Sequence, residues 1–200
     1  MSGMVGPNAS LQLATALRAE GGDVLAAEVF GAAGQAALLE APPRVMIDER
    51  VPAALFDALW RVVPDRAERI AAEAGRRTAD YVLANRMPAA IRRLLRALPD
   101  RLAARLLLVA IRRNAWTFAG SGACVVAVPG AALAIDGNPM PMPGATWHRA
   151  VLGRMAAALL HPATRVAHVA CPHGAGRACF AIRAPGGDGA APCGDCRLRG

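Results

Sequence analysis

Apolar residues recur at helical spacing through the first 113 residues of the chain. In the segment 53–63, Leu55 and Leu59 lie four positions apart, and in the segment 66–85 Ile70 and Ala74 repeat that interval. This spacing places apolar side chains on one face of a helix. Proline, glycine and capping residues punctuate the pattern and predict helices over about 8–20, 23–32, 53–63, 66–85, 88–98 and 100–113.

The pattern changes after Asn114, where β-branched residues and glycines become frequent. We expect two antiparallel strands within 115–128 and 130–140, a helix over 148–160, and two more strands over 164–171 and 178–183. Helices followed by a small sheet indicate an α+β fold, with a helical first half packed on a small antiparallel sheet.

Composition narrows the class of protein. Apolar residues make up 54% of the chain and aromatic residues only 4%, so the core is built mainly from Ala, Leu and Val. No apolar run approaches the roughly 20 residues that span a bilayer. The first residues have neither the basic start nor the apolar stretch of a secretory signal. These features predict a cytoplasmic protein and leave peripheral membrane contact open.

The charge is strongly basic, with a net value of +8 carried on arginine alone. Seven arginines fall between Arg92 and Arg113. A basic helix face there suits phosphates, anionic lipid or the carboxylates of a small ligand. The alternative is a solvated helix face. Nucleic acid is excluded as a partner, because no recognised binding motif is present and the arginines do not alternate with aromatic residues.

Two glycine-rich stretches, GSGACV and GAGRAC, partly match the fingerprint of a dinucleotide site. That fingerprint needs three glycines between a strand and a helix. Val125 and Cys179 stand where the third glycine belongs, and both stretches lie between expected strands. We therefore expect no dinucleotide site. A serine nucleophile motif is absent as well, and Cys124 is interpreted as a packing residue of a strand.

The last expected hairpin carries candidate metal ligands. Cys171 and Cys179 flank its turn, and His168 lies three positions before the first. Residues that face each other across an antiparallel pair lie about 5 Å apart. Two thiolates and an imidazole suit Zn²⁺. Free structural thiols are the alternative, and a disulfide is disfavoured in a reducing cytoplasm.

Zinc needs a fourth ligand, for which the chain offers several candidates. His148 lies at the start of the expected late helix, His173 lies in the turn, and Cys193 and Cys196 form a C-x₂-C pair in the tail. In a regular strand His168 would point away from Cys171, so a bulge is required between them.

Three stretches resemble the 4-vinyl-reductase domain family, named for a protein of bacteriochlorophyll biosynthesis. They are EAGRRTADYVL, TWHRAVLGRMAAALLHP and VAHVACPHGAGRACFAIR, and the likeness covers about Ile47 to Arg183. It implies a helical segment over 1–46, an α+β ligand-binding domain over 47–184, and a tail over 185–200. Sensor members of the family build a zinc site from a cysteine before the late helix and a Glu-x₂-Cys-x₇-Cys hairpin.

Carried onto this chain, the hairpin ligands would be His168, Cys171 and Cys179, with His in place of Glu. The early cysteine would fall at Ala145 or Thr146, which cannot supply a thiolate. His148 would then act as the substitute ligand.

The resemblance further implies a role in bacteriochlorophyll synthesis, at reduction of the 8-vinyl (old numbering 4-vinyl) group of a protochlorophyllide-type ring. A non-catalytic tetrapyrrole carrier and a small-molecule sensor are the alternatives. The partner would be a Mg-tetrapyrrole, with other enzymes of the pathway and a second copy of the chain left open. We expect an apolar cavity between the helical half and the late helix, with the residues of ligand contact being Trp116, Trp147, Arg92, Arg93 and Arg96.

Overall fold

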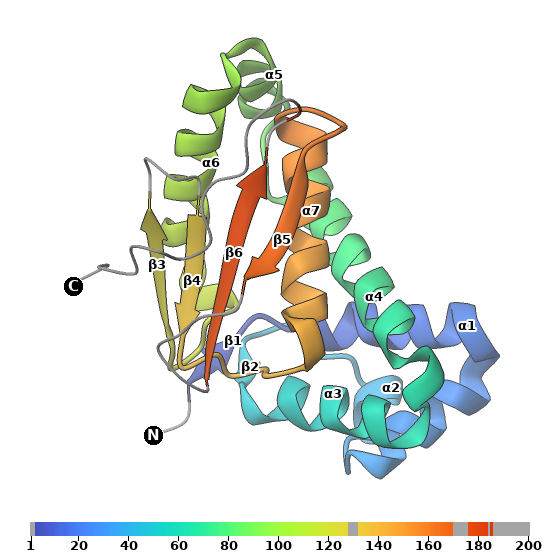
Figure 1. The fold of residues 1–200 in the computed structure, drawn as a ribbon. Helices are drawn as coiled ribbons and strands as arrows, with labels where there is room; N and C mark the ends of the chain where they lie inside the picture. The colour runs from blue at the N-terminus through green and yellow to red at the C-terminus, as the bar shows by residue number, and fades with distance from the viewer. Residues whose placement is uncertain (1–2, 128–131, 170–175, 184, 186–200) are drawn as a thin grey trace.

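The computed structural model describes residues 3–127, 132–169, 176–183 and 185, and it confirms the α+β class. Figure 1 shows a twisted sheet with helices against one side and a group of helices beyond them. The helices are α1 (Asn8–Ala32), α2 (Ala37–Glu40), α3 (Arg50–Val62), α4 (Pro64–Asn85), α5 (Ala89–Ala97), α6 (Asp100–Arg113) and α7 (Thr146–Leu159). The strands are β1 (Met4–Val5), β2 (Ile47–Asp48), β3 (Ala123–Ala127), β4 (Ala132–Asp136), β5 (Arg165–Val169) and β6 (Arg177–Arg183).

Proline and glycine set the boundaries of the helices. Pro64 occupies the first turn of α4, and Pro88 and Pro99 directly precede α5 and α6. A proline suits the start of a helix because it lacks an amide hydrogen that the first turn would leave unbonded. The break expected at Gly21 and Gly22 is a kink inside α1, where both residues leave the helical region.

The main sheet has four antiparallel strands in the order β3-β4-β6-β5. Phe180 of β6 lies opposite Leu133 of β4 and His168 of β5. Because side chains alternate across a strand, these three residues share one face of the sheet. That face packs against α6 and α7, where Leu108 and Leu159 belong to the same buried cluster as Phe180.

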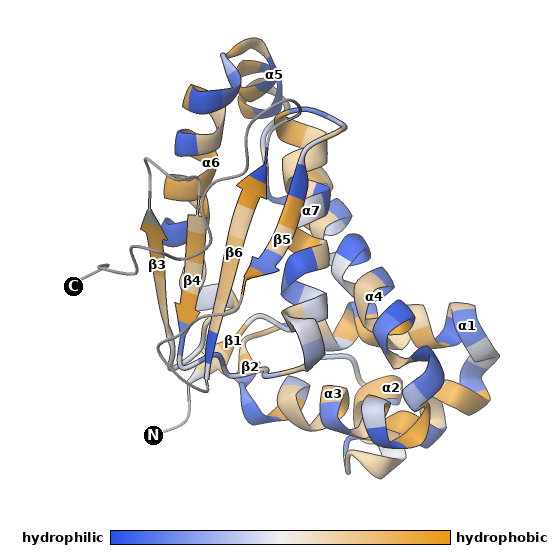
Figure 2. Cartoon of the chain, viewed as in Figure 1, coloured by the Kyte–Doolittle hydropathy of each residue, from blue (hydrophilic) through white to orange (hydrophobic). Residues whose placement is uncertain are grey.

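The described residues form two hydrophobic clusters in the interior. The first joins α1, α3 and α4 and includes Phe30, Leu59 and Trp147. The second joins α6, α7 and the sheet around Leu108 and Phe180. Phe118 and Val151 contact both clusters. Figure 2 shows hydrophobic and hydrophilic residues alternating along the helices that bound them.

A hydrogen-bonded carboxylate ties the N-terminal segment to the sheet. Strands β1 and β2 pair, and the carboxylate of Glu49 then accepts bonds from the Gly3 amide (2.9 Å), the Ser121 amide (2.7 Å) and the Ser121 hydroxyl (2.7 Å). Burial would raise the pKa of Glu49, but the three bonds outweigh it and lower the pKa. Within the described ranges, no helix is both long and apolar enough to cross a bilayer.

Candidate functional site

The start of α7 is built on a strained turn. Ala145, just before the helix, has φ 45°, and among the described residues it alone has a positive φ without being glycine. A left-handed conformation costs an L-residue roughly 1–2 kcal/mol. The Thr146 hydroxyl donates to the Pro143 carbonyl at 2.8 Å, and the Trp147 amide donates to the Met142 sulfur at 3.4 Å. These contacts fix the two aromatic residues that open the helix.

Trp147 lies at the junction of the helical layer and α7, and only 4% of it is exposed. Its ring centroid lies 6.4 Å from that of Phe56 in α3 and 4.9 Å from that of His148, which it meets edge to face. Its indole Nε1 has no hydrogen-bond partner among the described residues. A buried indole amide usually finds a partner, so this donor is an exception.

His148 is 2% exposed, and neither ring nitrogen has a partner among the described residues. Its ring lies 6.3 Å from Phe180 on the helix-facing side of the sheet. Burial, aided by the nearby His168, lowers the pKa of His148 to about 3. The imidazole is therefore neutral at physiological pH, with one nitrogen able to donate and the other able to accept or to bind a metal.

A pocket of about 380 Å³ lies beside Trp147, between α3 and the turn before α7. Its lining residues are Phe56, Asp57, Trp60, Arg61, Pro141, Met142 and Pro143. Trp147 contacts two of them, Phe56 by its ring and Met142 by its backbone amide. The lining is mainly apolar, and Asp57 and Arg61 add two charged side chains to it. The cavity expected from the sequence was to lie between the helical half and α7; this pocket adjoins the start of α7.

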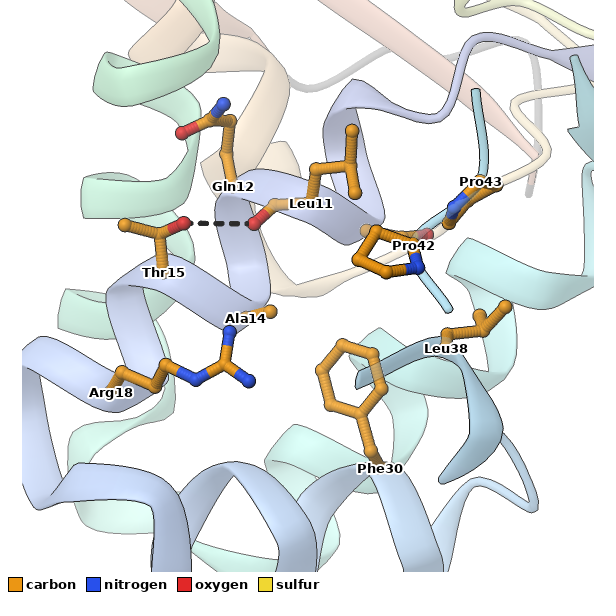
Figure 3. A pocket seen from close by; sticks show the side chains of 10 residues that line it. Leu11, Gln12, Ala14, Thr15, Arg18, Phe30, Leu38, Pro42 and Pro43 are labelled. Atoms are coloured by element: carbon orange, nitrogen blue, oxygen red, sulfur yellow. Dashed lines mark hydrogen bonds between the residues drawn. The ribbon is translucent and has the colours of Figure 1, made fainter. Parts of the chain in front are cut away.

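A second pocket, of about 190 Å³, opens between the two halves of α1 and the segment after α2 (Figure 3). Phe30 and Leu38 form an apolar wall, and Arg18 reaches toward its mouth. The Thr15 hydroxyl is already bonded to the Leu11 carbonyl at 3.1 Å. The pocket is half the size of the first. Neither Phe56 nor Met142, the residues that link the first pocket to Trp147, belongs to its lining, so the first pocket is the stronger candidate.

The other ligand residues expected from the sequence lie elsewhere. Trp116 is 60% exposed and is absent from both pocket linings. Arg92 and Arg96 lie on α5, where Arg92 donates to the Leu83 carbonyl and Arg96 to the Ala158 carbonyl near the end of α7. The structure therefore does not bring Arg92, Arg93 and Arg96 to Trp147, because they sit at the opposite end of α7.

The structure places the expected metal ligands on both faces of the sheet. His168 lies opposite Phe180, whereas Cys179 lies opposite Val169 and Ala134. Since neighbouring residues of a strand alternate, Cys179 faces away from the side that holds His168 and His148. Cys171 lies outside the described residues, and the zinc site stays a prediction. Within the described ranges, no three metal-ligating side chains form a cluster.

The remaining sequence candidates have structural roles. Burial raises the pKa of Cys124 to about 11, against a small opposite effect of Arg112, so this thiol is protonated at neutral pH. The stretch Gly120–Gly122 precedes β3, and its Ser121 donates two hydrogen bonds to the Glu49 carboxylate. A side chain at Gly122 would lie 2.5 Å from the carbonyl oxygens of Asp136 and Gly137, which accounts for glycine there.

Sequence reasoning missed the pocket residues of α3. Phe56 and Trp60 are four positions apart, as neighbours on one helix face, and Arg61 follows directly. Aromatic residues are rare in this chain, so two of them at helical spacing beside an arginine were the available signal. The sequence cannot show which loop closes over them, because Met142 is 82 positions beyond Trp60.

Comparison with known proteins adds a family. No protein-family model matches the chain. Similar curated proteins include the bacteriochlorophyll synthase 23 kDa chain of Cereibacter sphaeroides, which is 39% identical over 175 residues that cover 84% of both chains. A protein of the same name from Rhodobacter capsulatus is 34% identical over 189 residues, covering 92% of this chain and 88% of the relative.

Proposed function

The chain belongs to the family of the bacteriochlorophyll synthase 23 kDa chain, and from this premise we propose that it acts at the step reducing the 8-vinyl group of a protochlorophyllide-type ring. The observation that carries the pathway is the 39% identity to the Cereibacter sphaeroides protein over 84% of both chains. The vinyl-reduction step rests on the resemblance of the hairpin and late-helix motifs. The relatives are named as one chain of a synthase, which favours association with other proteins of the pathway.

The pocket beside Trp147 is the proposed place of ring contact. Trp60 is partly exposed and offers a flat apolar surface to a planar macrocycle, and Met142 adds an adaptable thioether wall. The buried Phe56 completes the apolar lining. A volume of about 380 Å³ suits one edge of a tetrapyrrole, with the rest of the ring outside. The exposed Arg61 at the rim would pair with the ring's propionate, because a guanidinium binds a carboxylate through two parallel hydrogen bonds.

Trp147 and His148 support this pocket from behind. Trp147 contacts Phe56 and Met142, so movement of a pocket wall on binding would be felt at the indole and at the adjoining imidazole. The unpartnered nitrogens of these two residues are polar groups held in an apolar interior. Such groups are costly to bury, and they favour a site that gains polar partners when a ligand is present.

A non-catalytic carrier is the second candidate. It is favoured by the place of the glycine-rich stretch at 120–122, which is bonded to Glu49 through Ser121 and leads into β3 instead of opening a helix. A dinucleotide pyrophosphate is normally held at a helix N-terminus after a strand. Under this reading the chain would present the ring to a separate reductase.

The test is a titration of the purified full chain with divinyl protochlorophyllide, followed by its absorption spectrum with and without NADPH. We expect a spectral shift on binding. Trp60→Leu and Arg61→Gln should each weaken binding about ten-fold, the order of one lost charge-assisted bond or aromatic contact. Conversion to the monovinyl spectrum on adding NADPH would support catalysis, and binding without conversion would support the carrier.

Arg93→Gln is the matched control, since Arg93 is exposed on α5 at the far end of α7. Weakened binding in Arg93→Gln with no effect of Arg61→Gln would move the ring to α5 and contradict the pocket. No spectral change with the unaltered chain would contradict the proposed function itself.

A further inference from the structure

Exposed apolar side chains are concentrated in one part of the sequence, on α5, α6 and the turn that follows α6. Nine large apolar residues are exposed within the described ranges, and six of them fall between Ile91 and Trp116. These six, here called the α5–α6 stripe, are Ile91, Leu94, Leu102, Leu106, Val109 and Trp116. Scattered apolar residues on a surface are ordinary, whereas apolar residues aligned on one exposed face mark a place of contact.

Helix α6 is apolar on two opposite sides. Leu107, Leu108 and Ile111 are buried in the cluster that contacts the sheet. Leu102, Leu106 and Val109 follow at intervals of four and three, so they line up along the helix, and each is about 40% exposed. At 3.6 residues per turn, this row lies nearly opposite the buried one. The fold therefore leaves an apolar seam of α6 without a partner among the described residues.

Arginines border this seam, and acidic residues are nearly absent from the same two helices. Arg101, Arg105 and Arg112 lie along one flank of α6, and α5 adds three more arginines. Between Ala89 and Arg113 the only acidic residue is Asp100. None of these arginines forms an ion pair with a described residue, while Arg92 and Arg96 donate to backbone carbonyls. Figure 2 shows hydrophobic and hydrophilic residues interspersed along both helices.

We propose that the α5–α6 stripe docks on the surface of an anionic lipid bilayer. An exposed apolar row beside arginines is the composition of helices that lie flat in the headgroup region. The leucines would enter the acyl boundary, and the arginine stems would run along it with their guanidinium groups at lipid phosphates. Trp116, 60% exposed in the turn that follows α6, has the amphipathic ring that favours this interface.

The charge selects a membrane over a second copy of this chain as the occupant. A second copy would bring seven more arginines against the first seven, and Asp100 of each copy could offset little of that repulsion. An anionic surface instead attracts each arginine, and the attraction falls within a Debye length and weakens with salt. This inference is independent of the proposed function, because neither Trp60 nor Arg61 belongs to the stripe.

The experiment is flotation of the full chain with vesicles of phosphatidylcholine containing about one-third phosphatidylglycerol, and with pure phosphatidylcholine as the comparison. We expect binding to the anionic vesicles at low salt, a loss of binding as salt rises, and little binding to the neutral vesicles. Arg101→Gln with Arg105→Gln should weaken binding about 25-fold, roughly five-fold for each charge removed. Leu102→Ser with Leu106→Ser should weaken it at least as much.

Trp116 gives a second readout in the same experiment. Its fluorescence should shift to shorter wavelength and become protected from an aqueous quencher when anionic vesicles are added. Trp116→Phe should remove that signal, because Trp147 is already buried and Trp60 lies on α3. Circular dichroism and thermal unfolding of each variant establish that it folds, which we expect because all the altered side chains are exposed.

Arg44→Gln with Val45→Ser is the matched control, an exposed arginine beside an exposed valine elsewhere on the surface. It should leave vesicle binding unchanged. The proposal fails if the chain does not bind anionic vesicles at low salt, or if the paired leucine variant binds as well as the unaltered chain. It also fails if the unaltered chain is a dimer that the paired leucine variant dissociates, because the stripe would then be a protein interface.

Discussion

At the scale of single residues, the start of α7 concentrates the unusual features of this molecule. Ala145 has a left-handed backbone, and Trp147 and His148 bury polar atoms without partners among the described residues. Strain and unsatisfied polar groups are costly, and they persist where the surrounding structure holds them or where a function needs them. The contrast with Glu49 is informative: that carboxylate is also buried, but it accepts three hydrogen bonds.

His148 should make the chain sensitive to mild acid. Its pKa falls from 6.5 to about 3 on folding, so below pH 6.5 the unfolded chain binds a proton that the folded chain excludes. The free energy of unfolding should therefore decrease as the pH falls, by up to about 1.4 kcal/mol for each pH unit. Urea unfolding at pH 7, 6 and 5 measures this slope above the ordinary pKa of Glu49, which is 4.5.

In His148→Leu the slope between pH 7 and pH 5 should flatten, because no imidazole remains to be protonated at this site. Leu59→Ala serves as the control, because Leu59 is fully buried and does not titrate, so this substitution should lower the stability at every pH and leave the slope unchanged. Equal slopes in the unaltered chain and in His148→Leu would contradict the lowered pKa of His148 and would mean that its imidazole is solvated or hydrogen-bonded.

At the scale of elements, the crossing of α4 and α7 sets the position of the candidate site. A side chain at Gly75 would lie 2.6 Å from the Trp147 carbonyl oxygen and 2.8 Å from the Ala150 Cβ. Glycine therefore lets the backbone of α7 approach α4 closely at the level of Trp147. Two ion pairs, Arg149–Glu68 at 3.0 Å and Arg154–Asp80 at 2.7 Å, border the crossing, but both are exposed and add little stability.

Gly75→Ala should destabilise the chain by about 1–3 kcal/mol, because the added methyl group must push against backbone. It should also displace Trp147 and change its fluorescence. Gly153→Ala is the matched control on α7: its Cβ would meet nothing within 4 Å, so helix propensity should make it more stable by about 1 kcal/mol. Urea unfolding measures both, and equal effects of the two substitutions would mean that the crossing is not close.

The elements also show what the sequence could predict. The starts of α4, α5 and α6 were predictable because each has a proline at or just before it. Strands β1 and β2 were not, since two residues each carry no periodicity and only their pairing defines them. The end of the first helix near Glu20 was predictable as well, because Gly21 and Gly22 leave the helical region and divide α1 into two helical halves there. His148 is buried against Trp147, which itself contacts Phe56, and against Phe180 of the sheet. No local pattern in the sequence shows these contacts.

The zinc site predicted at the β5–β6 hairpin can be tested by metal analysis. We expect chain purified without a histidine tag to carry about one equivalent of zinc, lost in Cys171→Ser and in Cys179→Ser, because two thiolates in one hairpin select Zn²⁺. A chelator should lower the melting temperature, since bound metal contributes to folding free energy. Cys124→Ser on β3 is the control and should retain the metal. If the chain carries far less than one equivalent of zinc, and both hairpin variants keep the melting temperature of the unaltered chain, Cys171 and Cys179 are structural thiols.

At the scale of the whole molecule, two hydrophobic clusters meet along α4 and α7. The sequence suggested a boundary at Ile47, between a helical segment and a ligand-binding domain. In the structure β1 pairs with β2 across that boundary, and α1 packs with α3 and α4 in one cluster. Phe118 and Val151 then connect this cluster to the one around the sheet. The proposed ring pocket lies on the first cluster and the α5–α6 stripe lies on the second.

The shared residues predict that both clusters unfold together. Leu59 is fully buried in the first cluster and Leu108 in the second, so each substitution by alanine should cost about 2–5 kcal/mol. If the chain is one cooperative unit, both variants should shift a single transition, seen identically by circular dichroism and by tryptophan fluorescence. Two separate transitions, with Leu108→Ala moving only one of them, would instead show two units. In that case ligand binding beside Trp147 should raise the melting temperature of the Leu59 unit alone, whereas in a cooperative chain it stabilises the helices of the α5–α6 stripe as well.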